Sequence, residues 1–485
     1  MNRQIRRLGI ALLVLFGALF VQLNVIQVLR AGTYNDNPNN TRAIVRDFSR
    51  PRGQILAADG TVLARSVPAE GRFERQREYP EGELFADVTG YFSFVAGADG
   101  VERTYNDVLA GRTSESADGI GDLLLGGPRT ADVTVTIPAE VQRVARDALG
   151  STRGSVVALD PRDGSILALW SFPSYDPSVL SSTDVEAAQA ARQRLLEDES
   201  NPLLPASFRE TYFPGSTFKV VTAAAGLSSG AVSVDGPSYP RSSEYVPPQT
   251  STGINNFGGG TCGGALFAIL RVSCNTAFAQ MGVDLGADAL VRRAEAFGFN
   301  GVPPLDLPAV EASPIGDAAS FDANLPVLAM TAIGQNAVRS TPLQMALVAG
   351  GVANGGEVMV PHVMAEVRDK GGEIVDTYEP AVWSRAMSEA DAAILTEAMV
   401  GVVADGTATG LAVPGVTTAG KTGTAQLGNG QSHAWIIGFA PAEAPRVAVA
   451  VIVEAQPGAS EQTGGRVAAP IGRAVLEAAL AAVSP

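Results

Sequence analysis

The segment from which the architecture of this chain can be worked out reads Phe213-Pro214-Gly215-Ser216-Thr217-Phe218-Lys219-Val220. Pro214 and Gly215 break the chain just before a helix-compatible run that ends at Ser228-Ser229-Gly230, which predicts a helix with Ser216 in its first turn. Lys219 follows one turn later on the same face. A serine hydroxyl is a poor nucleophile until a base takes its proton, and a neutral lysine amine within hydrogen-bond reach can be that base. The spacing therefore fits an activated serine.

The lysine content of the chain supports a chemical role for Lys219. Arginine supplies nearly all of the positive charge, and the sequence contains three lysines, Lys219, Lys370 and Lys421. Arginine does not give up its proton in proteins, whereas burial can lower the pKa of a lysine toward neutrality. A Ser-x-x-Lys pair alone also arises by chance on many helices, so the motif needs support from the rest of the chain.

The composition is that of a globular protein large enough for two or three domains. The chain has 485 residues, of which 46% are hydrophobic, and a formal net charge of −15. This negative balance, without a basic cluster beyond the N-terminus, argues against nucleic acid as a partner. Two histidines and two cysteines, scattered singly, argue against a zinc site, and no metal or other cofactor is expected.

The N-terminal residues predict a membrane anchor. Residues 8–30 are mainly apolar and follow three arginines in residues 1–7, and their length suffices to cross a bilayer as a single helix. Basic flanks stay in the cytoplasm, so we expect residues 1–7 to be a cytoplasmic tail and the chain after Arg30 to lie outside the cell membrane. A cleaved signal peptide is the alternative, but no clear small-x-small cleavage site follows the apolar run.

Cys262 and Cys274 fit an exported protein, but the sequence leaves their pairing open. If residues 264–273 are helical, a rise of about 1.5 Å per residue holds the two cysteines too far apart for a disulfide. If the glycine-rich segment around Gly258-Gly259-Gly260 folds back, the two can meet.

Residues 31–150 are interpreted as a small N-terminal pedestal or dimerisation-like domain together with a linker, which is expected around residues 126–131. The pattern of turn residues and short apolar runs predicts strands and then a helix, at residues 52–55, 62–64, 133–137 and 138–149.

Residues 151–485 are predicted to form an α+β domain. Two apolar runs, residues 155–160 and 165–170, flank a Pro-x-Asp-Gly turn, which is typical of an antiparallel hairpin. Strands at both ends of this region around a helical middle predict one antiparallel sheet with a helical lobe beside it. The other expected strands are residues 416–426, 433–439 and 447–455, and the expected helices are residues 184–196, 216–227, 275–297 and 468–483.

Two further segments carry side chains suited to the chemistry of a Ser-Lys pair. Ser273-Cys274-Asn275 lies between two helical runs, where a Ser and an Asn can point into a cleft, although both are also common helix starters. Lys421-Thr422-Gly423-Thr424 belongs to a formal Walker A match that begins at Gly415. A strand instead of a helix follows it, which argues against a phosphate loop. Neither serine has a Gly-x-Ser-x-Gly elbow, so a Ser-His-Asp triad is not expected.

Together the three motifs form a complete acyl-transfer set: a serine nucleophile, a lysine one turn on, a second serine with an asparagine, and a Lys-Thr-Gly-Thr strand edge. With this set the chain resembles the class B penicillin-binding proteins, which are monofunctional peptidoglycan D,D-transpeptidases. The resemblance covers nearly the whole chain and includes segments that begin at Arg52, Ser174, Gly334 and Thr341. It implies the penicillin-binding/serine β-lactamase-like fold, with a five-stranded antiparallel sheet flanked by helices and a helical lobe.

The resemblance also implies a role for each catalytic residue. Ser216 would attack the carbonyl between the last two D-alanines of a peptidoglycan stem peptide, and an amine of a neighbouring stem would resolve the acyl-enzyme into a cross-link. Lys219 would take the hydroxyl proton. Ser273 would relay a proton to the leaving amine beside the positive charge of Lys421. Asn275 would hold the substrate amide and help orient Lys219.

Substrate binding is expected at the third motif. Thr422 and Thr424 would bind the terminal carboxylate, and Gly423 would let the substrate backbone lie close against the strand edge. The backbone N–H groups of Ser216 and Thr424 would form the oxyanion hole. The expected partners are stem peptides, β-lactam antibiotics that acylate Ser216, and a membrane-embedded SEDS-type glycosyltransferase with division proteins.

Several other functions share parts of this pattern. A D,D-carboxypeptidase would use water in place of the acceptor amine, but the anchor and the N-terminal domain favour the cross-linking enzyme. A β-lactamase needs a glutamate that orients water, and none can be identified. A β-lactam sensor or division scaffold would keep an acylable serine without turnover, yet a sensor usually needs extra membrane segments. The ~120 residues between the anchor and the first strand of the main sheet are too few for a glycosyltransferase domain.

Overall fold

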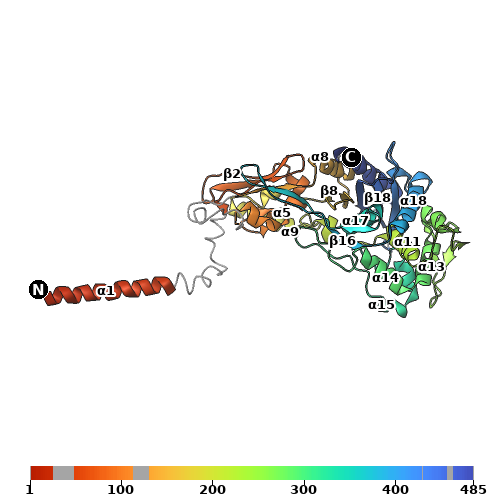
Figure 1. The fold of residues 1–485 in the computed structure, drawn as a ribbon, viewed down its shortest axis with the longest axis horizontal. Coiled ribbons are helices and arrows are strands. Elements are labelled where there is room, and N and C mark those ends of the chain that lie inside the picture. The colour runs from red at the N-terminus through yellow and green to blue at the C-terminus, as the bar shows by residue number, and fades with distance from the viewer. Residues whose placement is uncertain (1, 26–47, 113–129, 429, 456–462, 484–485) are drawn as a thin grey trace.

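The structure is a computed structural model that describes residues 2–25, 48–112, 130–428, 430–455 and 463–483 (Figure 1). Helix α1 (Asn2–Asn24) opens the chain. Its segment Arg3–Asn24 has a mean hydropathy of 1.8 and no buried residues, so it is long and apolar enough to cross a membrane, the one such helix in the described part of the chain. Residues 26–30 of the predicted membrane segment lie outside the described residues.

The predicted five-stranded antiparallel sheet is confirmed. Its strand order is β17-β18-β19-β7-β8, so strands from the two ends of the domain meet between β19 and β7. Strand β17 forms an edge. The strands are β7 (Gly154–Leu159), β8 (Ile166–Phe172), β17 (Ala419–Gln426), β18 (Ser432–Ala440) and β19 (Val447–Val453).

Helices cover this sheet on both faces. Every residue of β19 is buried, which a strand achieves only when both faces of its sheet are covered. Helix α17 (Pro342–Ala353) and helix α19 (Ala469–Ala482) both pack on β19, and α8 (Ala139–Leu149) packs on α19 and β8. Helix α17 is buried along nearly its whole length, consistent with a core helix.

The helical lobe follows the expected order with one correction. The predicted helix over residues 275–297 is two helices, α13 (Asn275–Leu285) and α14 (Ala287–Ala296). Gly286 has a φ of 78°, a left-handed conformation that a continuing helix cannot contain. The other helices of this region are α9 (Val185–Glu197), α10 (Ala206–Arg209), α11 (Lys219–Ser228), α12 (Leu266–Arg271), α15 (Ala319–Asp322), α16 (Leu325–Thr331) and α18 (Glu389–Asp405).

A second sheet combines strands from two distant parts of the sequence. Its order is β15-β14-β6-β1-β2-β3, in which β14 and β15 follow α17 in the sequence and the other four strands belong to the N-terminal region. The predicted division between residues 150 and 151 stays a prediction. The strands are β1 (Ile55–Leu56), β2 (Val62–Pro68), β3 (Arg75–Glu78), β6 (Asp132–Val135), β14 (Met364–Arg368) and β15 (Ile374–Thr377).

A buried ion cluster holds the N-terminal region together. Glu102 accepts hydrogen bonds from Arg52 Nε and Arg77 Nε, both at 2.6 Å, and its side chain has no solvent exposure. The guanidinium of Arg52 also lies over the ring of Phe92, 4.2 Å from its centroid. Three charges buried together cost desolvation energy, so each depends on the others for compensation.

The remaining elements are short. They are η2 (Gly82–Phe85), α4 (Ala86–Thr89), β4 (Phe92–Ser93), β5 (Gly97–Ala98), α5 (Gly100–Thr104), α6 (Asn106–Leu109), η4 (Pro177–Val179), η5 (Gly215–Phe218), β9 (Tyr239–Ser242), β10 (Glu244–Tyr245), β11 (Ile254–Asn255), η6 (Phe257–Gly259), β12 (Cys262–Gly264), β13 (Glu357–Met359), β16 (Val382–Arg385), η7 (Thr409–Leu411) and η8 (Gly464–Ala468).

Candidate active site

Ser216 lies on a tight turn that packs against the edge of the main sheet. The turn is the 3₁₀ segment η5, and the α-helix proper begins three residues later at Lys219. Gly215 has a φ of 54°, and its N–H donates to Gly334 O at 2.9 Å. A Cβ at residue 215 would stand 2.8 Å from Thr424 O, so only glycine fits there. The helix start predicted around Ser216 is confirmed.

The amine of Lys219 contacts residues of both the first and the second motif. Its Nζ lies 3.0 Å from Ser216 Oγ, 2.7 Å from the carbonyl oxygen of Ser273 and 2.6 Å from Asn275 Oδ1. The side chain has no solvent exposure. Burial, and then the positive charge of Lys421, hold the pKa of Lys219 well below its usual value. An amine in this environment is poised to be neutral.

The second motif lies between α12 and α13 and faces both lysines. Ser273 has a φ of 58°, which is uncommon for a residue with a side chain and costs backbone strain energy. Its hydroxyl accepts a hydrogen bond from Lys421 Nζ at 2.8 Å. Asn275 donates through Nδ2 to the backbone oxygen of Asn255 at 2.9 Å, which turns its Oδ1 toward Lys219. The sequence suggested that Ser273 and Asn275 can point into a cleft, and in the structure both line the same cleft.

The third motif lies on β17, the edge strand beside the nucleophile turn. Lys421 is fully buried, and burial lowers its pKa to about 7. Thr422 and Thr424 both line the cleft. A Cβ at Gly423 would approach Pro214 O to 2.9 Å, so this glycine also lets the nucleophile turn pack against the strand. Because β17 is an edge, its outward backbone groups can pair with an extended peptide.

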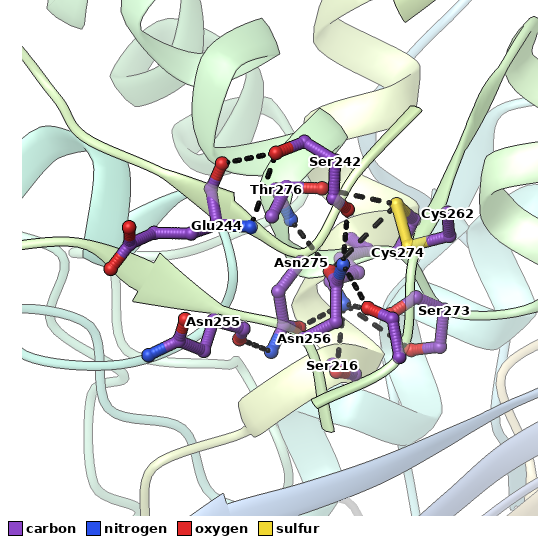
Figure 2. The surroundings of a disulfide bond; sticks show 12 residues. Ser216, Ser242, Glu244, Asn255, Asn256, Cys262, Ser273, Cys274, Asn275 and Thr276 are labelled. Atoms are coloured by element: carbon purple, nitrogen blue, oxygen red, sulfur yellow. Dashed lines mark hydrogen bonds between the residues drawn. A yellow bond between two sulfur atoms is a disulfide. The ribbon is translucent and has the colours of Figure 1, made fainter. Parts of the chain in front are cut away.

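Cys262 and Cys274 form a disulfide, which settles the pairing that the sequence left open. Only residues 266–271 of the intervening segment are helical, and Gly264, with a φ of 120°, reverses the chain before them. The cysteines therefore meet with a Cα–Cα distance of 5.8 Å. Figure 2 shows the bridge beside Ser273, so it ties the second motif to strand β12.

The site opens into a cleft with a volume of about 1110 Å³. Ser216, Ser273 and Asn275 line it, whereas the two lysines are buried beneath its surface. The described residues contain no group of three His, Cys, Asp or Glu side chains that could hold a metal ion.

Sequence reasoning missed three residues of the site. Asn256 is buried, donates to the carbonyls of Ser242 and Gly260 at 2.8 and 2.9 Å, and accepts from Thr276 N at 3.0 Å. It fixes β11 against the start of α13. Asn255 contributes only a backbone oxygen, which no sequence pattern predicts.

Thr407 is the third of these residues. Its Oγ1 lies 2.7 Å from Thr422 Oγ1. It lies 15 residues before Thr422 in sequence. The one available signal for it is its place among the small polar residues of the turn that follows α18.

The two histidines have structural contacts and do not line the cleft. His433 Nδ1 accepts from Ala455 N at 3.1 Å, and burial lowers the pKa of His433 to about 4. His362 stacks on Tyr378 with ring centroids 3.5 Å apart. Among the described residues, no serine hydroxyl is hydrogen-bonded to either imidazole ring.

Comparison with known proteins identifies the family. The model of the penicillin binding protein transpeptidase domain matches residues 154–477, and that of the penicillin binding protein A dimerisation domain matches residues 52–132. The chain belongs to the penicillin-binding protein transpeptidase family. The class B resemblance inferred from the three motifs is confirmed, as is a likeness to actinobacterial penicillin-binding protein A suggested by the short N-terminal domain and the arginine-rich composition.

Curated relatives and solved structures are similar to this chain over most of its length. The peptidoglycan D,D-transpeptidase PbpA of Mycolicibacterium smegmatis is 42% identical over 99% of both chains, and that of Mycobacterium tuberculosis is 40% identical over the same share. The ceftriaxone acyl-enzyme of penicillin-binding protein A from M. tuberculosis superposes with a TM-score of 0.83 at 40% identity, covering 90% of this chain and all of the other. The penicillin G acyl-enzyme of the same protein gives a TM-score of 0.81, covering 89% of this chain and all of the other.

Proposed function

We propose that this chain is a serine-type peptidoglycan D,D-transpeptidase that forms its acyl-enzyme on Ser216. The observation that carries the proposal is the set of contacts around the amine of Lys219. Membership of the penicillin-binding protein family, with PbpA transpeptidases as relatives, supports the same activity. The neighbouring acyl-enzyme structures with ceftriaxone and penicillin G support β-lactam binding.

The contacts of Lys219 fit a neutral amine, which has two N–H groups and one lone pair. The carbonyl oxygen of Ser273 and Asn275 Oδ1 can only accept hydrogen bonds from it, at 2.7 and 2.6 Å. These two acceptors use both N–H groups. The lone pair is then left for the hydroxyl proton of Ser216, whose Oγ lies 3.0 Å away. Lys219 is thereby set up as the general base.

Acylation follows from this arrangement. Ser216 Oγ bonds to the carbonyl carbon of the penultimate D-alanine as its proton passes to Lys219, and the N–H groups of Ser216 and Thr424 stabilise the negative oxygen. The carbon–nitrogen bond then breaks, and the proton held by Lys219 passes through the Ser273 hydroxyl to the leaving amine of D-alanine, which makes Lys219 neutral again. Ser273 Oγ lies 3.3 Å from Lys219 Nζ and 2.8 Å from Lys421 Nζ. The products are free D-alanine and an ester on Ser216.

Deacylation uses the same groups in reverse. An amine from a second stem peptide attacks the ester carbonyl, loses its proton to the base, and releases Ser216 with a new peptide cross-link. The edge of β17 supports donor binding, with Thr422 and Thr424 toward the carboxylate and Gly423 between them. A carboxypeptidase would differ only in using water for this step.

Helix α1 fits a membrane anchor, and the finer topology is part of the proposal. Three arginines precede its apolar segment, which favours a cytoplasmic N-terminus and a catalytic domain outside the membrane. We also propose that residues 31–150 form the N-terminal domain with its linker and that residues 151–485 form the transpeptidase domain. We further predict that the chain acts together with a SEDS-type glycosyltransferase and division proteins.

A donor–acceptor assay tests the proposed activity. The full-length chain in detergent is incubated with a stem peptide ending in D-Ala-D-Ala and an amine acceptor, and products are separated by mass. Cross-linked product that exceeds hydrolysed product, and that is lost in Ser216→Ala, is expected. Hydrolysed peptide alone at saturating acceptor would instead favour the carboxypeptidase.

A further inference from the structure

The cleft holds a positive charge that the mechanism above leaves without a role. Among the described residues that line the cleft, Arg466 is the only one with a formally charged side chain, and none is acidic. The side chain of Arg466 is exposed, and within the described part of the chain no residue bonds or ion-pairs with it. Other arginines, such as Arg209 with Asp99 at 2.8 Å, are paired with carboxylates.

An unpaired arginine is notable because this chain has an excess of acids. It contains 50 Asp and Glu against 35 Lys and Arg, so carboxylates to pair with are plentiful. A guanidinium in a cleft whose described lining residues include no acid is instead available to an anionic ligand.

The backbone around Arg466 is pressed against the Lys-Thr-Gly-Thr edge. A Cβ at Gly464 would stand 2.6 Å from Gly423 O, and a Cβ at Gly465 would stand 3.5 Å from Thr422 Cγ2. Two glycines thus allow segment η8 to lie directly beside β17. Arg466 is the next residue, so its side chain starts at the end of the cleft where the donor strand is expected to finish.

Hydroxyl groups surround the same end of the cleft. Thr407, Thr409, Thr422, Thr424 and Thr463 all line it. Thr407 Oγ1 and Thr422 Oγ1 lie 2.7 Å apart, so one hydroxyl proton is used between them and the other remains free for a ligand. A carboxylate accepts hydrogen bonds and donates none, so a guanidinium with hydroxyl donors is a matching site.

The two lysines of the site do not supply a lasting charge for that carboxylate. Both are buried and neither lines the cleft. Burial lowers the pKa of Lys421 to about 7, and burial together with the charge of Lys421 holds the pKa of Lys219 well below its usual value, so burial disfavours the charged form of both amines. An arginine keeps its charge throughout this range.

Strand geometry places a donor carboxylate near Arg466. Thr424 lies beside the nucleophile turn, and Thr422 is two residues away, or about 6.8 Å along an antiparallel strand. The terminal carboxylate of the donor lies one residue, about 3.5 Å, beyond the carbonyl that Ser216 attacks. For a donor that runs from Thr424 toward Thr422, the carboxylate therefore falls between these two threonines, on the part of β17 that lies against η8.

We propose that Arg466 is a specificity-determining residue that binds the C-terminal carboxylate of the donor peptide, together with the Thr407–Thr422 hydroxyl pair. The inference rests on the proposed transpeptidase function and adds a residue outside the three motifs. β-Lactams carry a carboxylate in the equivalent position, so they report on the same site.

Acylation kinetics with matched ligands test the proposal on the full-length chain in detergent. The second-order acylation constant is measured with penicillin G and with its methyl ester, for the wild type, Arg466→Gln, Arg466→Lys and the control Arg473→Gln. Arg473 is an exposed arginine on α19 that pairs with Glu477 at 2.8 Å. Thermal unfolding of each variant checks that folding is unchanged.

The expected result is a loss of preference for the acid. Arg466→Gln should slow acylation by penicillin G about 10- to 100-fold, the range for losing a charge-assisted contact, and slow the methyl ester less than threefold. Arg466→Lys should retain part of the preference, and Arg473→Gln all of it. A fall in the acid-to-ester ratio of less than about threefold in Arg466→Gln would overturn the proposal, as would equal losses for both ligands.

A second pair of donors separates the terminal carboxylate from an internal one. One stem peptide has its C-terminal carboxylate converted to an amide, and the other has an internal carboxylate amidated. The assignment is supported if the wild type prefers the donor with a free C-terminal carboxylate over its C-terminal amide and Arg466→Gln loses only this preference. It is overturned if Arg466→Gln loses only the preference that depends on the internal carboxylate. Absence of wild-type acylation on Ser216 would instead refute the proposed function itself.

Discussion

Lys421 Nζ lies 2.8 Å from Ser273 Oγ, and Lys219 Nζ lies 3.3 Å from the same oxygen. One hydroxyl therefore joins the two buried amines of the site. The two amines have opposite tasks in the mechanism, since Lys219 must be neutral to accept a proton and Lys421 must be charged to assist its transfer.

This relationship predicts a bell-shaped pH profile for acylation. The neutral fraction of Lys219 rises with pH, whereas the charged fraction of Lys421 falls as the pH passes its pKa of about 7. The second-order constant for a fluorescent penicillin should therefore rise and then fall between pH 5 and 9. Arginine stays protonated over this range, so Lys421→Arg should lose the falling limb if the variant remains active. A constant that rises steadily to pH 9 in the wild type contradicts the assignment of a charged Lys421.

Replacing Lys219 by arginine should abolish acylation, because it puts a permanent cation in the place of a neutral amine. A guanidinium cannot accept the hydroxyl proton of Ser216, and loss of a general base typically costs about 10²- to 10⁴-fold in rate. Stopped-flow measurement of acylation in Lys219→Arg gives the size of the loss. Retention of more than a tenth of the wild-type constant would show that another group is the base.

Asn256 should matter for both stability and acylation. Asn256→Ala removes three hydrogen bonds and leaves the carbonyls of Ser242 and Gly260 without these donors, so we expect a loss of about 2–3 kcal/mol in the free energy of unfolding. Acylation should slow as well, because β11 also holds the Asn275 side chain. The matched control is Asn255→Ala, whose side chain is exposed and whose backbone oxygen is kept. Equal unfolding curves for the two variants would refute this role.

The N-terminal ion cluster should be far more sensitive than an exposed ion pair. Glu102→Gln leaves Arg52 and Arg77 buried without a compensating charge, which typically costs about 3–5 kcal/mol. The control Glu78→Gln breaks only the exposed pair with Arg65, worth about 0–1 kcal/mol. Denaturant unfolding of both variants measures the difference. Similar midpoints for the two would contradict the proposed importance of burial.

The sequence identified the segments that the structure brings together at the candidate active site, but it did not predict which strands pair in the second sheet. Ser216, Ser273 and Lys421 lie in motifs whose local patterns, a break before a helix, a helix–helix junction and a strand, are short-range signals. Strands β14 and β15 gave no such signal, because their place in the N-terminal sheet depends on the pairing of Met364 with Val135, which are distant in sequence.

The disulfide and Arg466 were beyond sequence reasoning for related reasons. Whether Cys262 reaches Cys274 depends on where one short helix begins, and a single reversal at Gly264 decides it. Arg466 carries no pattern at all. It becomes notable only when the other described residues that line the cleft are known to be uncharged.

The central claim, that Ser216 is the nucleophile, is tested most directly by labelling. The full-length chain is incubated with a fluorescent penicillin, digested, and the modified residue is located by mass spectrometry, with Ser216→Ala as the control. A stable adduct on Ser216 that is absent from the variant is the predicted result. An adduct on Ser273 or elsewhere, or labelling that survives in Ser216→Ala, would contradict it.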